Sequence, residues 1–148
     1  MRRKFQEKQI FCFALVITFL GSSCTFLMVT KKGRIIGPHD ISSQVEWTKE
    51  ELEKEVALRN LRDTQEASFY LIRLSASERP HTHDFHDLVV FVLEGEGLVH
   101  LTDKTFKVKP GDVIEIPRGV VHWAEIIDNK PCVVYAIFTP PLEGPDQR

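Results

Sequence analysis

The segment HTHDFHDLVVFVLEGEG, residues 81–97, holds three of the six histidines of this chain beside a run of hydrophobic residues. Residues 88–94 (LVVFVLE) are mainly β-branched, aliphatic and aromatic, and such residues are enriched in strands. The Glu-Gly-Glu-Gly sequence of residues 94–97 then marks a turn. The segment therefore predicts a strand that ends at a tight turn, with the histidines directly before it.

The same pattern continues on both sides of this segment. From Ala67 onward hydrophobic residues recur with a period of two, and short turn sequences rich in Gly, Pro, Asn or Asp separate the hydrophobic runs. We expect strands over residues 67–74, 88–94, 97–102, 105–109, 112–116, 121–128 and 132–139. Many short strands at such regular spacing are typical of an antiparallel sandwich or barrel, so the predicted fold class is all-β.

The histidines indicate a metal site within that barrel. His81 and His83 are two residues apart, so in an extended segment their side chains point to the same face. His122 lies about forty residues later, directly after a Pro-x-Gly turn and at the start of another predicted strand. Two imidazoles on one face and a third from a distant strand form a donor set for a divalent transition metal.

Two stretches of the chain resemble the paired motifs of the cupin superfamily. The first motif runs His-x-His, three or four residues, Glu, six residues, Gly, and this chain reads HTHDFHDLVVFVLEG from His81 to Gly95. The second runs Gly, five residues, Pro-x-Gly, two residues, His, three residues, Asn, and this chain reads GDVIEIPRGVVHWAEI from Gly111 to Ile126, with Ile126 in place of Asn. The resemblance implies a single-domain cupin, a double-stranded β-helix or jelly-roll barrel.

The chain departs from the first motif at the glutamate that binds metal in the family. Leu88 stands at that position, and a leucine side chain offers no ligand atom. A two-residue turn over residues 84–85 would place His86 opposite His83, whereas a three-residue turn would place Asp87 there instead. Both alternatives stay open. The candidate metal ligands are therefore His81, His83, His86, Asp87 and His122.

The resemblance implies a type of site but not a particular reaction. The donor set suits iron, manganese, nickel, copper or zinc. Cupins include metal-dependent dioxygenases, isomerases and decarboxylases, as well as modules that bind sugars or other ligands. We therefore expect a small-molecule ligand or substrate at the metal, with no catalytic or substrate-binding residue assigned. A non-catalytic ligand-binding or assembly module is the alternative. Cupins commonly form dimers, so the resemblance also implies a homodimer.

The N-terminal part of the chain has a different character. Residues 1–9 hold four bases and one acid, and residues 10–29 hold no charge. This pattern predicts a signal peptide or membrane anchor over residues 1–29, which leaves the remainder outside the cytoplasm in the cell envelope. Residues 20–24 (LGSSC) resemble a bacterial lipoprotein box, so Cys24 is the candidate lipidation site. An uncleaved span of about 20 apolar residues is the alternative.

A linker and a helix are predicted between this leader and the barrel. Residues 30–47 contain glycine, proline and serine and predict a linker. The Thr-Lys-Glu-Glu sequence that starts at Thr48 matches a capping box, with Glu51 three residues after the cap. We expect a short amphipathic helix over roughly residues 48–60. The predicted boundaries are a helical segment over 48–66, the barrel over 67–141 and a tail over 142–148.

The charge balance argues against nucleic acid as a partner. The whole chain has a net charge of −2. Without residues 1–23, 15 of the 19 bases and 20 of the 21 acids remain, and the net charge falls to −5. A basic surface is the electrostatic requirement for binding nucleic acid, and this composition does not supply one.

Overall fold

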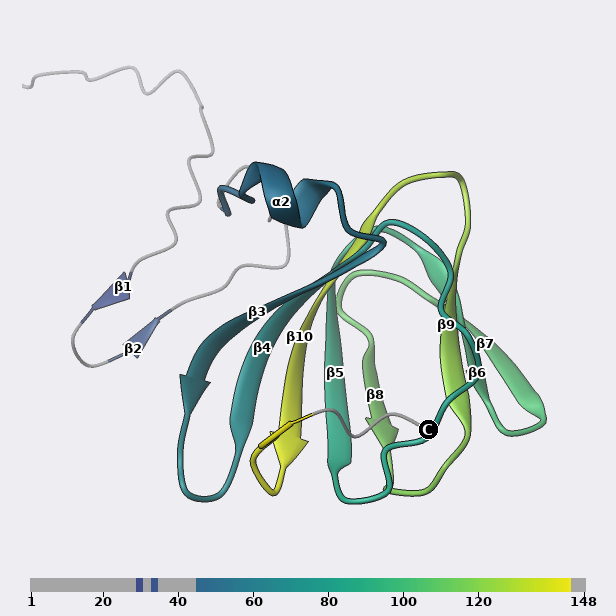
Figure 1. Cartoon of the computed structure of the whole chain (residues 1–148). Coiled ribbons are helices and arrows are strands. Elements are labelled where there is room, and N and C mark those ends of the chain that lie inside the picture. Colours follow the sequence, from purple (N-terminus) through teal and green to yellow (C-terminus); the bar gives the residue numbers. More distant parts are fainter. Residues whose placement is uncertain (1–28, 31–32, 35–44, 145–148) are drawn as a thin grey trace, which may run out of the picture.

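The structure, a computed structural model, describes residues 29–30, 33–34 and 45–144 (Figure 1). The predicted leader up to residue 28, with Cys24, lies outside the described residues, as does most of the predicted linker. Among the residues that are described, no helix combines the length and the hydrophobicity needed to cross a membrane.

Strands dominate the described part of the chain. In chain order the elements are β1 (Val29–Thr30), β2 (Gly33–Arg34), α2 (Lys49–Leu52), β3 (Val56–Asp63), β4 (Ser68–Leu74), β5 (Asp87–Glu94), β6 (Gly97–Leu101), β7 (Lys104–Val108), β8 (Val113–Ile116), β9 (His122–Ile126) and β10 (Cys132–Thr139). The seven strands predicted after residue 66 are confirmed as β4 to β10, each within two residues at either end.

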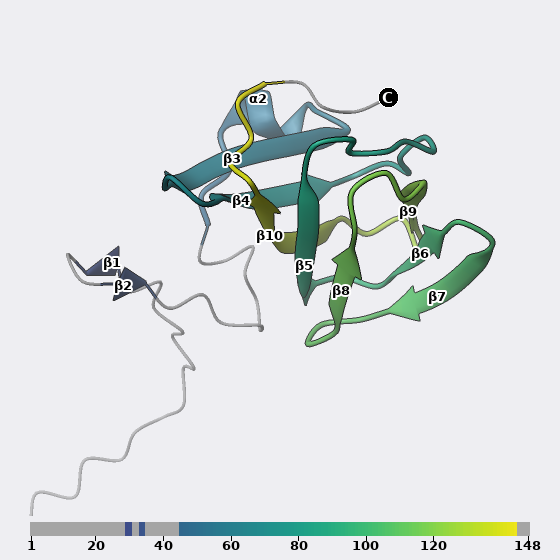
Figure 2. The same cartoon turned by 90° about the horizontal axis from the view of Figure 1, so that it is seen from below.

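The strands after α2 form two antiparallel sheets. One has five strands in the order β3-β4-β10-β5-β8, and the other has three in the order β7-β6-β9. Figures 1 and 2 show the smaller sheet folded over one side of the larger one. Val92 and Val134 of the larger sheet share a hydrophobic cluster with Val99 and Val108 of the smaller one. This arrangement confirms the predicted jelly-roll barrel.

The five-stranded sheet is hydrophobic on both faces, which explains why β5 and β10 read as nearly continuous hydrophobic runs. Leu88 and Phe138 belong to a cluster on the inner face. Leu93 and Val133 belong to a second cluster, and Val45 packs against it with only 5% of its surface exposed. The last residues of the predicted linker therefore form part of the core, and the linker prediction is wrong there.

The helix begins as predicted but is much shorter. Thr48 Oγ1 accepts a hydrogen bond from the Glu51 N–H at 3.2 Å, and Glu51 Oε2 accepts one from the Thr48 N–H at 2.8 Å. This is the predicted capping box. The helix ends at Leu52, however, and β3 begins at Val56. The helix expected over residues 48–60, within a helical segment to residue 66, is therefore wrong beyond its first turn.

Tertiary contacts explain why a strand replaces the rest of the predicted helix. Short helices depend on packing of an apolar face, and no residue of α2 is buried. As a strand, the segment instead pairs along β4 and buries Ala57 completely. Arg59 of β3 then binds the Glu51 carboxylate, with an Nε–Oε1 distance of 2.9 Å, and this contact lowers the pKa of Glu51 to about 2.

Gly95 fixes the turn between β5 and β6. Its φ of +82° lies in a region that residues with a Cβ atom rarely adopt. A Cβ atom there would lie 2.6 Å from the Pro131 carbonyl oxygen and 2.9 Å from Cys132 Cα. The site therefore requires glycine both for its backbone conformation and for its space.

Replacing Gly95 with alanine is expected to lower the free energy of unfolding by about 3 kcal/mol, through strain and overpacking together. Gly111→Ala is the matched control, because Gly111 has φ +98° but no other atom lies within 4 Å of the position that a Cβ atom would take there. That variant should lose only about 1 kcal/mol. Urea unfolding, monitored by tryptophan fluorescence, measures the free energy of unfolding of both variants. Equal losses would show that the close contacts of a Cβ atom at Gly95 do not lower stability.

Candidate metal centre

The site is built where a loop segment pairs with the start of β9. His81 and His83 lie between β4 and β5, and His122 is the first residue of β9. The His81 N–H donates to the His122 carbonyl at 3.0 Å, and the His122 N–H donates to the His81 carbonyl at 2.9 Å. The Gly119 N–H donates to the His83 carbonyl at 2.8 Å. Backbone pairing thus brings together histidines that are far apart in the sequence.

The three imidazoles form one compact cluster. The ring centroid of His81 lies 4.4 Å from that of His122, and the His83 ring lies 5.2 Å from each of the other two. One ring nitrogen of each residue lies within 4.8 Å of the others. His83 and His122 are buried, whereas His81 is partly exposed. The predicted grouping of His81, His83 and His122 is present in the fold.

Hydrogen bonds to the backbone set the tautomer of two of these rings. His81 Nδ1 lies 2.8 Å from the Arg79 carbonyl oxygen, and His122 Nδ1 lies 2.9 Å from the Val120 carbonyl oxygen. A carbonyl oxygen only accepts hydrogen bonds, so Nδ1 carries the hydrogen in both rings. In the neutral rings the lone pair is therefore on Nε2, which is the arrangement of a histidine prepared to bind metal.

Burial favours the neutral form of His122, which is the form that binds a metal. Removal from solvent lowers the pKa of His122 below its ordinary value, and the neighbouring His81 adds to this effect. The hydrogen bond to the Val120 carbonyl acts in the opposite direction and is the smaller influence compared with burial. An imidazole that stays neutral does not need to lose a proton before it binds a metal.

The turn expected over residues 84–85 does not produce a local hairpin. The backbone of His81 pairs with His122, so the predicted pairing of His83 with His86 is wrong. The physical reason is that β9 supplies hydrogen-bonding partners across the barrel that the sequence order alone does not reveal. No local turn therefore places His86 or Asp87 opposite His83 as a fourth ligand.

His86 and Asp87 are not brought into the three-histidine cluster. The His86 ring is buried, and its Nε2 donates to the Pro141 carbonyl at 3.1 Å. Asp87 Oδ1 accepts hydrogen bonds from the Arg118 backbone N–H at 3.0 Å and from Arg118 Nε at 3.2 Å. These bonds lower the pKa of the Asp87 carboxyl to about 2. Both side chains hold loops at this end of the barrel.

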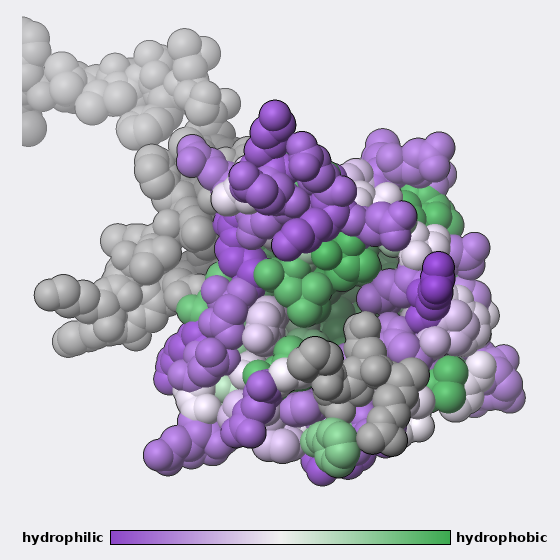
Figure 3. All heavy atoms as spheres, viewed as in Figure 1, coloured by the Kyte–Doolittle hydropathy of each residue, from purple (hydrophilic) through white to green (hydrophobic). Residues whose placement is uncertain are grey.

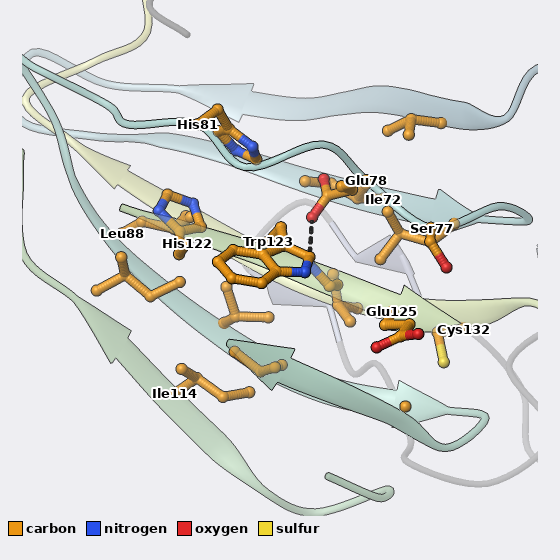
Figure 4. A pocket seen from close by; sticks show the side chains of 18 of the residues that line it. Ile72, Ser77, Glu78, His81, Leu88, Ile114, His122, Trp123, Glu125 and Cys132 are labelled. Carbon is orange, nitrogen blue, oxygen red and sulfur yellow. Dashed lines mark hydrogen bonds between the residues drawn. The ribbon is translucent and has the colours of Figure 1, made fainter. Parts of the chain in front are cut away.

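The histidine cluster lies at one end of a cavity of about 610 Å³ inside the barrel. Figure 4 shows His81 and His122 entering it from different segments, and Leu88 and Ile114 also line it. Most of the lining residues are hydrophobic. In the space-filling view, hydrophobic side chains gather in a hollow beneath the segment that Figure 1 labels α2 (Figure 3). The cavity is within the size range of small-molecule sites.

The chemistry of the donor set fits a transition metal. Three imidazoles are common ligands for such ions, and a three-residue set leaves coordination positions open to water or another ligand. Leu88, at the position of the family's glutamate, is buried and packs in the cluster that contains Phe138. The His83 ring lies 5.4 Å from the Phe138 ring, nearly perpendicular to it. A hydrophobic wall thus occupies the position at which the family has its glutamate ligand.

Sequence reasoning missed Glu78, a partly buried acid in the cavity wall. Its Oε2 accepts a hydrogen bond from the Ala124 N–H at 3.0 Å. Burial raises the pKa of this carboxyl group, while the Ala124 bond and the neighbouring His81 oppose that rise. Glu78 precedes a charged residue and a proline, so nothing in the sequence distinguishes it from a surface acid.

Comparison with known proteins agrees with this architecture. Residues 69–138 match the family model described as Cupin_2, a cupin domain. The chain is 34% identical over 114 residues to an uncharacterized protein of Aquifex aeolicus (strain VF5), an alignment that covers 76% of this chain and 93% of the relative.

Two further similarities link the chain to proteins with descriptive names. It is 41% identical over 71 residues to germin-like protein subfamily 2 member 4 of Arabidopsis thaliana, covering 44% of this chain and only 32% of that protein. The structure resembles that of the polyketide cyclase RemF from Streptomyces resistomycificus with a TM-score of 0.56 and 29% identity. That alignment covers 64% of this chain and 70% of RemF.

Removing one histidine of the cluster should remove most of the metal affinity. We expect His83→Ala and His122→Ala to weaken zinc binding by more than about 100-fold, since loss of a direct ligand exceeds the cost of losing an outer contact. Metal analysis and calorimetric titration of the full-length protein, purified without a polyhistidine tag, measure this.

His86→Ala and Asp87→Asn are the controls for that experiment, because both residues lie outside the cluster. Both variants should retain one metal per chain, and circular dichroism should show that every variant is folded. Loss of metal from folded His86→Ala or Asp87→Asn protein would contradict the three-histidine site.

Proposed function

The chain belongs to the cupin superfamily, and we propose that it binds a divalent transition metal and uses it to hold a small molecule in the barrel cavity. His81, His83 and His122 provide the ligands. The observation that carries this proposal is the convergence of three imidazoles, from two distant segments, on one end of a hydrophobic cavity. Iron, manganese, nickel, copper and zinc all accept such a donor set.

The residues of this chain orient the ligands and exclude water. When bound, the ion supplies a Lewis acid with positions open to a ligand. The carbonyl groups of Arg79 and Val120 hold the two Nδ1 atoms, which directs both Nε2 atoms away from those carbonyls. Leu88 covers one side of the site with hydrocarbon. In such surroundings the electrostatic attraction between an ion and its ligand is stronger than in water.

Two functions are compatible with this site, and they differ in whether a reaction follows binding. The similarity to RemF, a polyketide cyclase, supports an enzyme. The presence of Leu88 in place of a carboxylate favours the second candidate, a non-catalytic ligand-binding or assembly module. Glu78 is a partly buried acid in the cavity wall, and in an enzyme it is our candidate for proton transfer.

We further propose that the protein is exported and tethered outside the cytoplasm, by a lipid on Cys24 or by an uncleaved N-terminal span. The support is the basic start of the sequence followed by an uncharged run of 20 residues. A homodimer is also proposed. Phe91 and Val113 are 36% and 53% exposed and pair across β5 and β8, so they offer an apolar surface for a second copy.

The open coordination positions are tested with the cobalt-loaded protein. Adding azide should change the visible absorption spectrum, because azide occupies a position that the three histidines leave vacant. Leu88→Glu should weaken this response by about tenfold or more, since a carboxylate then competes for the metal. Leu88→Gln is the matched control and should respond nearly as the wild type does. Cobalt that binds but shows no response to azide would refute a ligand-accepting site.

The tethering proposal is tested by labelling growing cells with a radioactive fatty acid. Acylation of Cys24 should label the wild-type protein, and Cys24→Ala should carry no label. Cys132→Ala is the control, because Cys132 is buried in the barrel and should not affect labelling. An unlabelled wild-type protein that stays in the membrane fraction would instead support the uncleaved span.

A further inference from the structure

We propose that the ligand of the cavity is an amphipathic anion. Its negatively charged oxygen head binds at the three histidines, and its hydrophobic body lies along the inner face of the five-stranded sheet. This inference rests on the proposed function, because the head binds to the metal that the histidines hold. It specifies the class of molecule from the charge and shape of the cavity.

The charge balance of the site calls for a negative head group. Three neutral imidazoles contribute no charge, and Leu88 contributes none, so a divalent ion keeps both of its positive charges. Burying an uncompensated charge is costly, and an anionic ligand removes that cost. Glu78 does not belong to the metal-binding group, and its Oε2 accepts the Ala124 N–H. The compensating anion is therefore expected from the ligand.

No competing cation draws the anion elsewhere in the cavity wall. Among the described lining residues Arg79 is the one cation, and Arg79 is exposed to solvent. The other charged lining residues are acids. An anion in the interior of the cavity thus finds its favourable electrostatic position at the histidine end.

The shape of the cavity provides room for a hydrophobic body. At the histidine end, Phe138, Leu88 and Ile116 are neighbours across β10, β5 and β8, and all three line the cavity. Four residues further along β5 is Val92, which also lines the cavity. Four residues of a strand span about 13 Å. The inner face therefore provides a hydrophobic path of this length that leads away from the metal.

The far end of this path leads to the edge of the sheet. Val92, Val134, Ile72 and Leu58 are successive cross-strand neighbours from β5 to the edge strand β3, and all four line the cavity. Leu58 is 48% exposed although it lines the cavity, so the cavity opens to solvent beside it. Only a body long enough to pass Val92 and to cross β10 and β4 meets Leu58 at this mouth.

The test is calorimetric titration of the zinc-loaded, full-length protein with acetate, butyrate, hexanoate, octanoate and the longer tetradecanoate. Each added methylene group that enters the cavity should tighten binding by about fourfold, the value expected for transfer from water to a hydrophobic site. The metal-free protein should bind octanoate at least tenfold more weakly. Octanol, which has the same body without the negative head, should also bind at least tenfold more weakly than octanoate.

Leu58→Asp and Leu52→Asp form a matched pair that locates the body of the ligand. Leu58 and Leu52 are similarly exposed, at 48% and 51%, but only Leu58 lines the cavity. Leu58→Asp should weaken tetradecanoate binding at least tenfold and leave zinc content and the binding of acetate and octanoate unchanged, because octanoate is too short to pass Val92. Leu52→Asp should bind the whole series as the wild type does.

The outcomes separate this inference from the proposed function. Affinity that does not increase from acetate to octanoate, or equal tetradecanoate affinity in the two leucine variants, would overturn the hydrophobic body. Octanol binding as tightly as octanoate would overturn the anionic head. In each of these cases zinc still binds, so the proposed metal site stands. A wild-type protein that binds no zinc, cobalt, iron, manganese, nickel or copper would overturn both.

Discussion

The site depends on the backbone pairing of the segment that carries His81 with the first residue of β9. Two hydrogen bonds join His81 and His122, and a third joins His83 to Gly119. Because main-chain groups make these bonds, the spacing between the imidazoles is set by the geometry of paired strands rather than by flexible side chains. The pairing also joins the segment between β4 and β5 to the three-stranded sheet, so the contact that assembles the donor set is part of the fold.

The fold also places the three histidines, which form a neutral donor set, against a hydrophobic wall. Burial holds the pKa of His122 below its ordinary value, and Leu88 replaces a potential carboxylate with hydrocarbon. A metal held by these three residues would keep its positive charge and open positions, which would suit a ligand that brings a negative oxygen. The same wall continues along β5 and β10 into the cavity, so ligand binding and core packing draw on the same inner face.

Residues next to the histidines serve the site by supporting its loops. Asp87 accepts hydrogen bonds from the backbone and the side chain of Arg118, in the turn that precedes His122. His86 donates to the Pro141 carbonyl and so fastens the chain after β10 to the histidine end of the barrel. Each residue has a chemistry that suits metal binding, yet each already has a partner in this fold. His86 and Asp87 are of residue types that bind metals, yet they support the loops of the site and do not belong to its donor set.

The sequence by itself determined the strands of the barrel and the grouping of His81, His83 and His122, because alternating hydrophobic residues and paired motifs are local patterns. It also determined the helix start at Thr48, because a capping box lies within four residues. Only the tertiary structure decided that residues 56–63 form an edge strand, that His86 and Asp87 hold loops, and that Glu78 lies in the cavity wall. These outcomes depend on partners from β4, the Arg118 turn, Pro141 and Ala124, which are brought near only when the barrel closes. Contacts between distant segments outweigh local propensity wherever they supply the burial or the hydrogen bonds that a local structure lacks.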